Sequence, residues 1–359
     1  MKRIQYITVI AIVTLLIAAC GQTPASQPTT DPAGTTASQP TTDPAGTTAN
    51  QPTTAPAGTT ANQPTAAPEA IAVMASTSIV ADVVRQVGGE RVQVDTIVPT
   101  GADGHSYEPS PQDLARVNTA KAIFIVGAGY EEFIERLIAS SGTQAPVASL
   151  SENLALRTMS EEEAAGHAHD EHGDEHEHSH EADKVDGHTW TDPANVKAWV
   201  DVIASTLSQL DPAGANTYTT RAAEYQRQLD ELDRWITEQF AVIPAERRLI
   251  VSDHMIFGYM ADRYGLRQVG AIIPGVSTST APSAQELAAL QDLITDNGVT
   301  AIFVGDIANQ QLAEQIARDT GAKIVRVLTE SLTDANGPGA TYIDYMRYNV
   351  TQMVDALRG

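Results

Sequence analysis

The stretch AGANTYTTRAAEYQRQLDELDRWITEQFAV, residues 213–242, contains no proline and predicts a single long helix. Its large apolar side chains recur at near-heptad spacing: Leu229, Leu232, Trp235 and Ile236. At about 1.5 Å per residue, such a helix runs on the order of 40 Å, long enough to join two lobes as a stiff spine. An ordinary amphipathic helix packed within one lobe is the alternative.

Short apolar runs alternate with helical periodicity on both sides of this helix, which is typical of parallel sheets covered by helices. Before it, we expect strands and helices in this order: Ile71–Ala75, helix Ile79–Val87, Val92–Val98, Ala122–Val126, helix Glu131–Ala139 and Val147–Leu150. After it, we expect Leu249–Val251, helix Phe257–Tyr264, Val269–Ile273, helix Ala284–Ile294, Ala301–Val304, helix Gln311–Thr320, Ile324–Val327 and a closing helix from about Tyr342. The predicted fold class is α/β, with two Rossmann-like lobes, each with a central parallel sheet, joined by one long rigid helix.

These patterns predict the division of the chain. The N-terminal lobe takes residues 70–210, the connecting helix 211–243 and the C-terminal lobe 244–359. Residues 21–69 repeat a twelve-residue unit rich in threonine, proline, alanine and glycine, with no large apolar side chains. Such a segment buries too little surface to offset chain entropy, so we expect a disordered linker.

Residues 1–20 predict an export signal. Lys2 and Arg3 precede an apolar run that ends in Ile17-Ala18-Ala19-Cys20, which looks like the lipobox of a bacterial lipoprotein. Lipidation of Cys20 would anchor the protein to the cell membrane on its extracytoplasmic side, periplasmic or cell-surface. A soluble-secretion signal with an incidental cysteine is the alternative. Because Cys20 is the only cysteine, the chain has no internal disulfide, no thiolate metal site and no cysteine nucleophile.

The charge balance is strongly acidic. Lysine and arginine total 22 against 45 acidic residues, which gives a formal net charge of −23. This balance disfavours nucleic acid as a partner. It is compatible with attracting cations, although most of this charge serves to keep a surface protein soluble.

Six of the nine histidines fall in HAHDEHGDEHEHSH, residues 167–180, within a predicted loop at 161–187. They are His167, His169, His172, His176, His178 and His180. Imidazoles and carboxylates at this density can chelate borderline-soft dications in many interchangeable geometries, so we interpret the loop as an auxiliary, low-affinity metal collector. An acidic solvated insertion without a metal role is the alternative.

The other three histidines, His105, His188 and His254, are isolated along the chain. A lone histidine is more often a hydrogen-bonded structural residue than a metal ligand. Each of these, however, falls in a loop beside the predicted strands, where ligands gather in open α/β sheets.

The segments around these histidines resemble the zinc/manganese-type substrate-binding proteins of bacterial ABC importers. The matching segments are VPTGADGHSYEPSP (98–111), GHTWTDPANV (187–196) and VSDHMIFGYMADRYGL (251–266). The resemblance implies that His105, His188 and His254 are metal ligands, and that Trp190 and Asp192 support the second turn. It extends from about residue 71 to the C-terminus and implies two α/β lobes bridged by one long helix, with the metal between them.

A carboxylate, usually aspartate, is the fourth ligand in that family, in a loop before a Pro-Gly-x-x-Tyr stretch. In VLTESLTDANGPGATYIDYM, residues 327–346, Glu330 stands at that position, and Asp334 is the nearest substitute. Three imidazoles and one carboxylate suit tetrahedral zinc, whereas manganese prefers more oxygen. Manganese members of the family tend to carry glutamate in the third position, so His254 favours zinc. Copper or nickel would bind such a donor set comparably well.

The resemblance implies an extracytoplasmic subunit that captures zinc and delivers it to an ABC permease and its ATPase, with a monomer as the default state. A manganese-specific protein, a non-metal solute-binding protein and a surface adhesin, with a role in cell adhesion, are the alternatives. A zinc hydrolase is disfavoured because the sequence has no HExxH motif and no nucleophile elbow, so we predict no enzyme and no catalytic residue.

Overall fold

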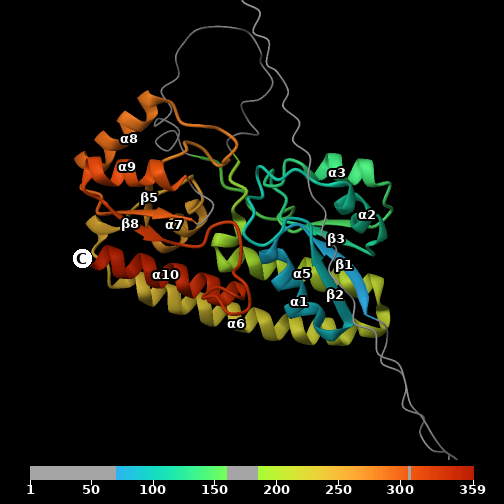
Figure 1. Cartoon of the computed structure of the whole chain (residues 1–359). Coiled ribbons are helices and arrows are strands. Elements are labelled where there is room, and N and C mark those ends of the chain that lie inside the picture. Colours follow the sequence, from blue (N-terminus) through green and yellow to red (C-terminus); the bar gives the residue numbers. More distant parts are fainter. Residues whose placement is uncertain (1–69, 160–184, 306–308) are drawn as a thin grey trace, which may run out of the picture. The chain divides into compact units, whose positions relative to one another are not determined.

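Two parallel sheets form the centres of two lobes in the computed structural model, which describes residues 70–159, 185–305 and 309–359 (Figure 1). The N-terminal sheet has the order β2-β1-β3-β4, with β1 Ile71–Ala75, β2 Val92–Thr96, β3 Ile123–Ile125 and β4 Val147–Ser149. The C-terminal sheet has the equivalent order β6-β5-β7-β8, with β5 Leu249–Ser252, β6 Arg267–Ala271, β7 Ala301–Val304 and β8 Lys323–Arg326. The described residues all fall in one compact unit, Thr65–Gly359. The predicted two-lobed α/β fold class is confirmed.

The N-terminal lobe contains helices α1 Ser78–Gly88, α2 Pro111–Thr119, α3 Ile134–Ser141 and α5 Pro193–Leu210. Helices α2 and α5 were not predicted from the sequence, although both begin with strong capping signals. Ser110 and Asp113 form a reciprocal capping box at the start of α2. At the start of α5, Asp192 accepts a hydrogen bond from the backbone of Ala194 at 2.8 Å.

The C-terminal lobe contains helices α7 Gly258–Tyr264, α8 Ala284–Asp296, α9 Gln310–Thr320 and α10 Tyr342–Arg358. All four begin within one residue of the predicted starts. Strand β6 is displaced toward the N-terminus by two residues from the predicted Val269–Ile273. The reason is that the end of that apolar run continues as a loop, in which Ile272 and Ile273 donate backbone hydrogen bonds to Ser252 and Asp253.

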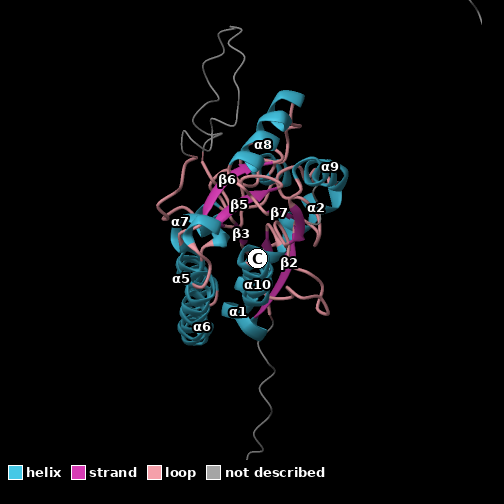
Figure 2. Cartoon of the chain, turned by 90° about the vertical axis from the view of Figure 1, so that its left-hand side faces the viewer, coloured by secondary structure: helices cyan, strands magenta, loops and turns pink. Residues whose placement is uncertain are grey.

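The long helix α6, Ala215–Ala241, contacts α1 and α5 of the N-terminal lobe and α10 and α7 of the C-terminal lobe. Figures 1 and 2 show α6 running beneath both lobes, with α10 alongside one part of it and α5 alongside another. Trp235 is half-buried beneath Arg347 of α10, whose guanidinium carbon lies 4.9 Å from the ring centroid. The predicted spine is therefore confirmed, and packing within a single lobe is excluded.

One hydrophobic core runs through both lobes and the helices between them. The same cluster of buried side chains includes Phe124 of the first sheet, Leu232 of α6 and Phe303 of the second sheet. Lobes that share a core resist independent motion, because separating them exposes apolar surface.

Several predicted features lie outside the described residues: the signal peptide at 1–20 with Cys20, the linker at 21–69, and His167, His169, His172, His176, His178 and His180. At the ends of the gap at 160–184, Thr158 and Val185 pair as an antiparallel bridge. Next to them, the Asp186 amide donates to the Arg157 carbonyl at 2.9 Å. The two ends of this segment are thus held together. None of the helices in the described ranges combines the length and the apolar character needed to cross a membrane.

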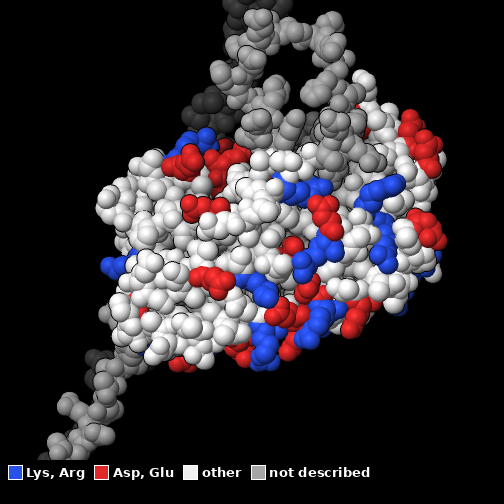
Figure 3. All heavy atoms as spheres, turned by 180° about the vertical axis from the view of Figure 1, so that it is seen from behind, with Lys and Arg blue, Asp and Glu red and all other residues white. Residues whose placement is uncertain are grey.

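Ion pairs line the lower edge of the molecule, where α6 runs (Figure 3). Lys197 pairs with Asp230, and Arg263 pairs with Asp233 at 2.8 Å. Exposed pairs of this kind contribute little to stability. The fold therefore depends on its buried core.

Replacing Leu232, which is 0% exposed, by alanine should lower the free energy of unfolding by about 2–5 kcal/mol. Urea denaturation followed by circular dichroism measures this loss. A single transition is expected, since both lobes pack on the same core. The exposed Glu238 on the same helix provides the control, and Glu238→Ala should change stability by less than about 0.5 kcal/mol. Two separate transitions would show that the lobes unfold independently.

Candidate metal centre

Four buried side chains that are distant in sequence meet between the two sheets: His105, His188, His254 and Glu330. Their ligand-capable atoms all lie within 4.8 Å of one another. Three of them follow strands β2, β5 and β8 in the chain, and His188 precedes the short 3-10 helix at Thr189–Thr191. The carboxyl ends of parallel strands are where open α/β sheets gather ligands. The exposed Asp334, the alternative to Glu330, lies outside this group.

The same ring nitrogen of each histidine points to the centre. Nε2 of His188 lies 3.1 Å from Nε2 of His105 and 3.2 Å from Nε2 of His254. Oε1 of Glu330 lies 2.8 Å from Nε2 of His254, 3.6 Å from that of His188 and 3.9 Å from that of His105. Three nitrogens and one oxygen therefore face a common point.

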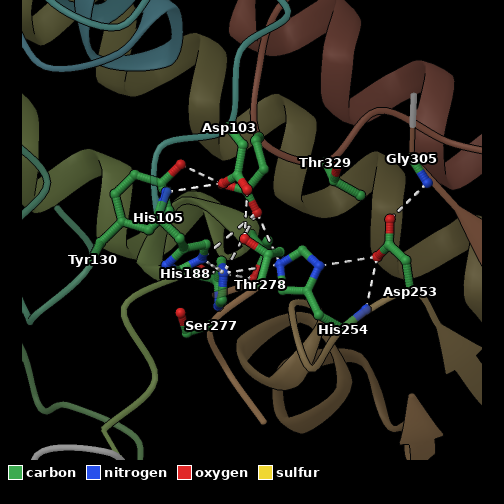
Figure 4. Close-up of polar contacts among 12 residues, drawn as sticks. Asp103, His105, Tyr130, His188, Asp253, His254, Ser277, Thr278, Gly305 and Thr329 are labelled. Carbon is green, nitrogen blue, oxygen red and sulfur yellow. Dashed lines mark hydrogen bonds and ion pairs between the residues drawn. The ribbon is translucent and has the colours of Figure 1, made fainter. Parts of the chain in front are cut away.

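Carboxylates fix the orientation of two of the imidazole rings. Nδ1 of His188 donates to Asp186 at 2.8 Å, and Nδ1 of His254 donates to Asp253 at 3.0 Å. The second oxygen of Asp253 accepts from the Gly305 amide at 2.8 Å (Figure 4). A proton held on Nδ1 leaves the lone pair on Nε2 directed at the centre, which is the arrangement that metal-binding histidines use.

Tyr130 occupies the remaining side of the site and uses the second oxygen of Glu330. Its hydroxyl donates to Oε2 of Glu330, and its ring packs edge-on against His105, with 4.7 Å between centroids. Gly104 and Gly187 each precede a histidine and leave room for this ring. A Cβ at Gly104 would lie 2.3 Å from the Tyr130 hydroxyl, and one at Gly187 would lie 2.9 Å from the Tyr130 Cβ.

The turn after His188 is supported as the sequence predicted. The buried Trp190 donates from its indole nitrogen to the Tyr345 hydroxyl at 3.3 Å, and its carbonyl accepts from the Tyr342 hydroxyl at 2.7 Å. Asp192 caps the helix that follows. These contacts join the turn of the second histidine to α10.

Glu330 is the carboxylate that faces all three imidazoles. Among the described residues, its buried Oε1 accepts no well-aligned hydrogen bond. Burial opposes ionisation of Glu330, but the imidazoles of His188 and His254 outweigh burial and hold its pKa well below the usual range. Burial likewise opposes a charge on His254, yet Asp253 and Glu330 raise its pKa to about 10. Without a metal, a proton therefore balances the carboxylate at neutral pH.

His105 behaves differently from the other two histidines. Burial dominates its surroundings and lowers its pKa to about 4, although the carboxylate of Glu330 acts in the opposite direction. This imidazole is therefore neutral at neutral pH, and it can bind a cation without releasing a proton.

Sequence reasoning missed the residues that support the four donors: Asp103, Tyr130, Asp186 and Asp253. Three of them carried a signal, because Asp253 directly precedes His254, and Asp103 and Asp186 each stand two residues before a histidine in the order Asp-Gly-His. Tyr130 carried none, since its partner Glu330 is 200 residues away in the chain.

The model of the family described as "Zinc-uptake complex component A periplasmic" matches residues 73–356. The chain is 30% identical over 290 residues to the manganese-binding lipoprotein MntA of Halalkalibacterium halodurans, covering 80% of this chain and 89% of that protein. It is 26% identical over 279 residues to the iron-binding protein YfeA of Yersinia pestis, covering 77% of this chain and 83% of that protein.

A solved structure shares the fold. The periplasmic zinc binding protein TroA of Treponema pallidum matches with a TM-score of 0.71 at 23% identity, covering 81% of this chain and 100% of that chain. The resemblance stated from the sequence is thereby confirmed. Because the family match spans most of its length, the chain belongs to the family of the periplasmic zinc-uptake complex component A.

Proposed function

We propose that the chain is the extracytoplasmic substrate-binding subunit of an ABC importer, which captures a divalent transition-metal ion and delivers it to a membrane permease coupled to an ATPase. The observation that carries this proposal is Oε1 of Glu330, buried without a well-aligned hydrogen bond and facing the Nε2 atoms of three histidines. A dication satisfies an anionic oxygen and three imidazole lone pairs together. Membership of the family and relatives named as metal-binding lipoproteins support the same reading.

Zinc is the favoured ion because of the number and the chemical type of the donor atoms. The Tyr130 hydroxyl donates to Oε2 of Glu330, which favours binding of a metal by Oε1 alone. Three nitrogens and one oxygen then complete a four-coordinate site, which suits zinc. Manganese prefers more oxygen ligands. Relatives named for manganese and iron make manganese the second candidate.

The remaining features of the chain fit the same role. A lipid anchor at Cys20, with the linker at 21–69, would hold the folded body away from the membrane. The six histidines at 167–180 would add a low-affinity metal collector to the four-residue site. A monomer is the default state for such a transport subunit. Binding is favoured over hydrolysis, since four protein donors leave no open position for the water that a zinc hydrolase needs.

A metal titration tests this function. The full chain, and a variant lacking residues 166–181, should each retain one tightly held zinc ion when titrated against a competing chelator, because the four proposed ligands lie outside that segment. His254→Ala should weaken zinc affinity by more than about a hundredfold, since it removes a ligand and also removes the imidazole that Asp253 and Glu330 share. If the shortened variant holds no stoichiometric metal, the four residues are not a metal site.

Metal binding should release protons. Asp253 and Glu330 raise the pKa of His254 to about 10, and Asp186 with Glu330 raises that of His188, although burial opposes both. The metal-free site therefore holds a proton that the metal must displace, so affinity rises as pH rises through neutrality and falls on acidification. Calorimetric titrations at pH 7 in buffers of different ionisation enthalpy should show about one or two protons released per ion. Release of none would contradict the imidazole assignment.

Tyr130→Phe should reduce the preference for zinc over manganese. Removing the hydroxyl frees Oε2 of Glu330, and a carboxylate with two available oxygens suits an ion that takes more oxygen ligands. The ratio of the two affinities should fall by about tenfold, as expected for one hydrogen bond to a charged group. Tyr107 is the matched control. Its hydroxyl also donates to a carboxylate, that of Asp113 at 2.9 Å, but this pair is not part of the metal centre. Tyr107→Phe should leave the ratio unchanged, and an equal change in both variants would refute the role of Tyr130.

A further inference from the structure

The three imidazoles of the metal centre are held in two different ways. His188 and His254 are fixed through their rings by aspartates. No described carboxylate accepts a hydrogen bond from Nδ1 of His105. Instead, Oδ1 of Asp103 accepts from the backbone amide of His105 at 2.9 Å. The direction of the His105 ring therefore depends on the turn that Asp103 shapes.

The second oxygen of Asp103 joins this turn to the other lobe. Oδ2 accepts from the Ser106 hydroxyl at 2.8 Å, a local contact, and from the Thr278 hydroxyl at 2.5 Å. Figure 4 shows Thr278 beside the histidines, together with Ser277, whose hydroxyl donates to Glu132 at 3.4 Å. Both contacts cross from the C-terminal lobe to the N-terminal lobe.

The loop that carries Thr278, residues 272–283 between β6 and α8, is anchored beside His254. The Met255 amide donates to the Gly275 carbonyl at 2.9 Å, and the Ile273 amide donates to the Asp253 carbonyl at 2.7 Å. Val276 packs on a small apolar cluster that includes Met255. Gly275 has φ +105°, a conformation that other residues rarely adopt, at the turn from the anchored part of the loop to the part that contacts the N-terminal lobe.

We propose that Thr278 is a positioning residue for metal capture, which acts on His105 through Asp103. The Thr278 hydroxyl ties the loop at 272–283 to Asp103, and Asp103 fixes the turn that carries His105. Among the three histidines, His105 is the one whose ring no described carboxylate holds. Breaking the contact between Thr278 and Asp103 loosens His105 and leaves three donors on the metal, so His105 is the first ligand to detach. The inference rests on the proposed function and concerns the rate at which the metal leaves.

Thr278→Val removes the hydroxyl at nearly constant volume, and Thr278→Ser keeps it. The full chain and both variants are loaded with zinc, and transfer of the ion to a chromogenic chelator is followed by stopped flow. Dissociation should be about tenfold faster for Thr278→Val, as expected when a hydrogen bond to a charged group is lost. Thr278→Ser should remain close to the unaltered chain.

A double-mutant cycle distinguishes positioning of His105 from a general structural effect. In the His105→Ala background, Thr278→Val should produce no further loss of zinc affinity, because the residue through which it acts is absent. Equal dissociation rates for the unaltered chain and Thr278→Val, or an undiminished effect without His105, would overturn the inference. Failure of the unaltered chain to bind zinc or manganese tightly would instead overturn the proposed function.

Discussion

A single buried carboxylate surrounded by three imidazoles is the constraint on which the rest of the structure depends. Removing the charge of Glu330 from water is tolerated only if cationic or hydrogen-bonding partners replace the water. Those partners come from loops of both lobes, so the two sheets must keep a fixed separation. The long helix α6 and the core that runs through both lobes maintain that separation. The fold thus holds the Glu330 carboxylate and the three imidazoles around it in fixed positions.

Much of the fold could be predicted from periodicity alone. Strands β1 and β7 have the predicted bounds, because buried parallel strands consist of continuous apolar runs. Helix α2 escaped prediction for the opposite reason. It buries only Asp113 and Val117, so its sequence has almost no apolar period, and only its capping box marks it. Helix α5 was also missed, although it buries Trp199 and Ile203 in the core, so the lack of an apolar period accounts for α2 alone.

For the candidate site, the sequence predicted the four metal donors but not most of the residues that position them. The three histidines and Glu330 came from resemblance to a family, since nothing in their spacing indicates that they meet. Some residues that orient the histidines can be recognised because they are close to them in the sequence, as Asp253 is to His254. Tyr130 and Thr278 act across distances of 200 and 175 residues, and such contacts exist only once the chain has folded. Local patterns identify donors, whereas the geometry that selects among ions is tertiary.

The bridge between Thr158 and Val185 has a consequence for how this protein can diverge. Because the two ends of the segment at 160–184 are clamped together, its length and composition are uncoupled from the position of His188 a few residues later. Insertions or deletions there leave the register of the downstream turn unchanged. A change in the length of the chain between Thr158 and Val185 would therefore leave the four donors of the metal centre in place.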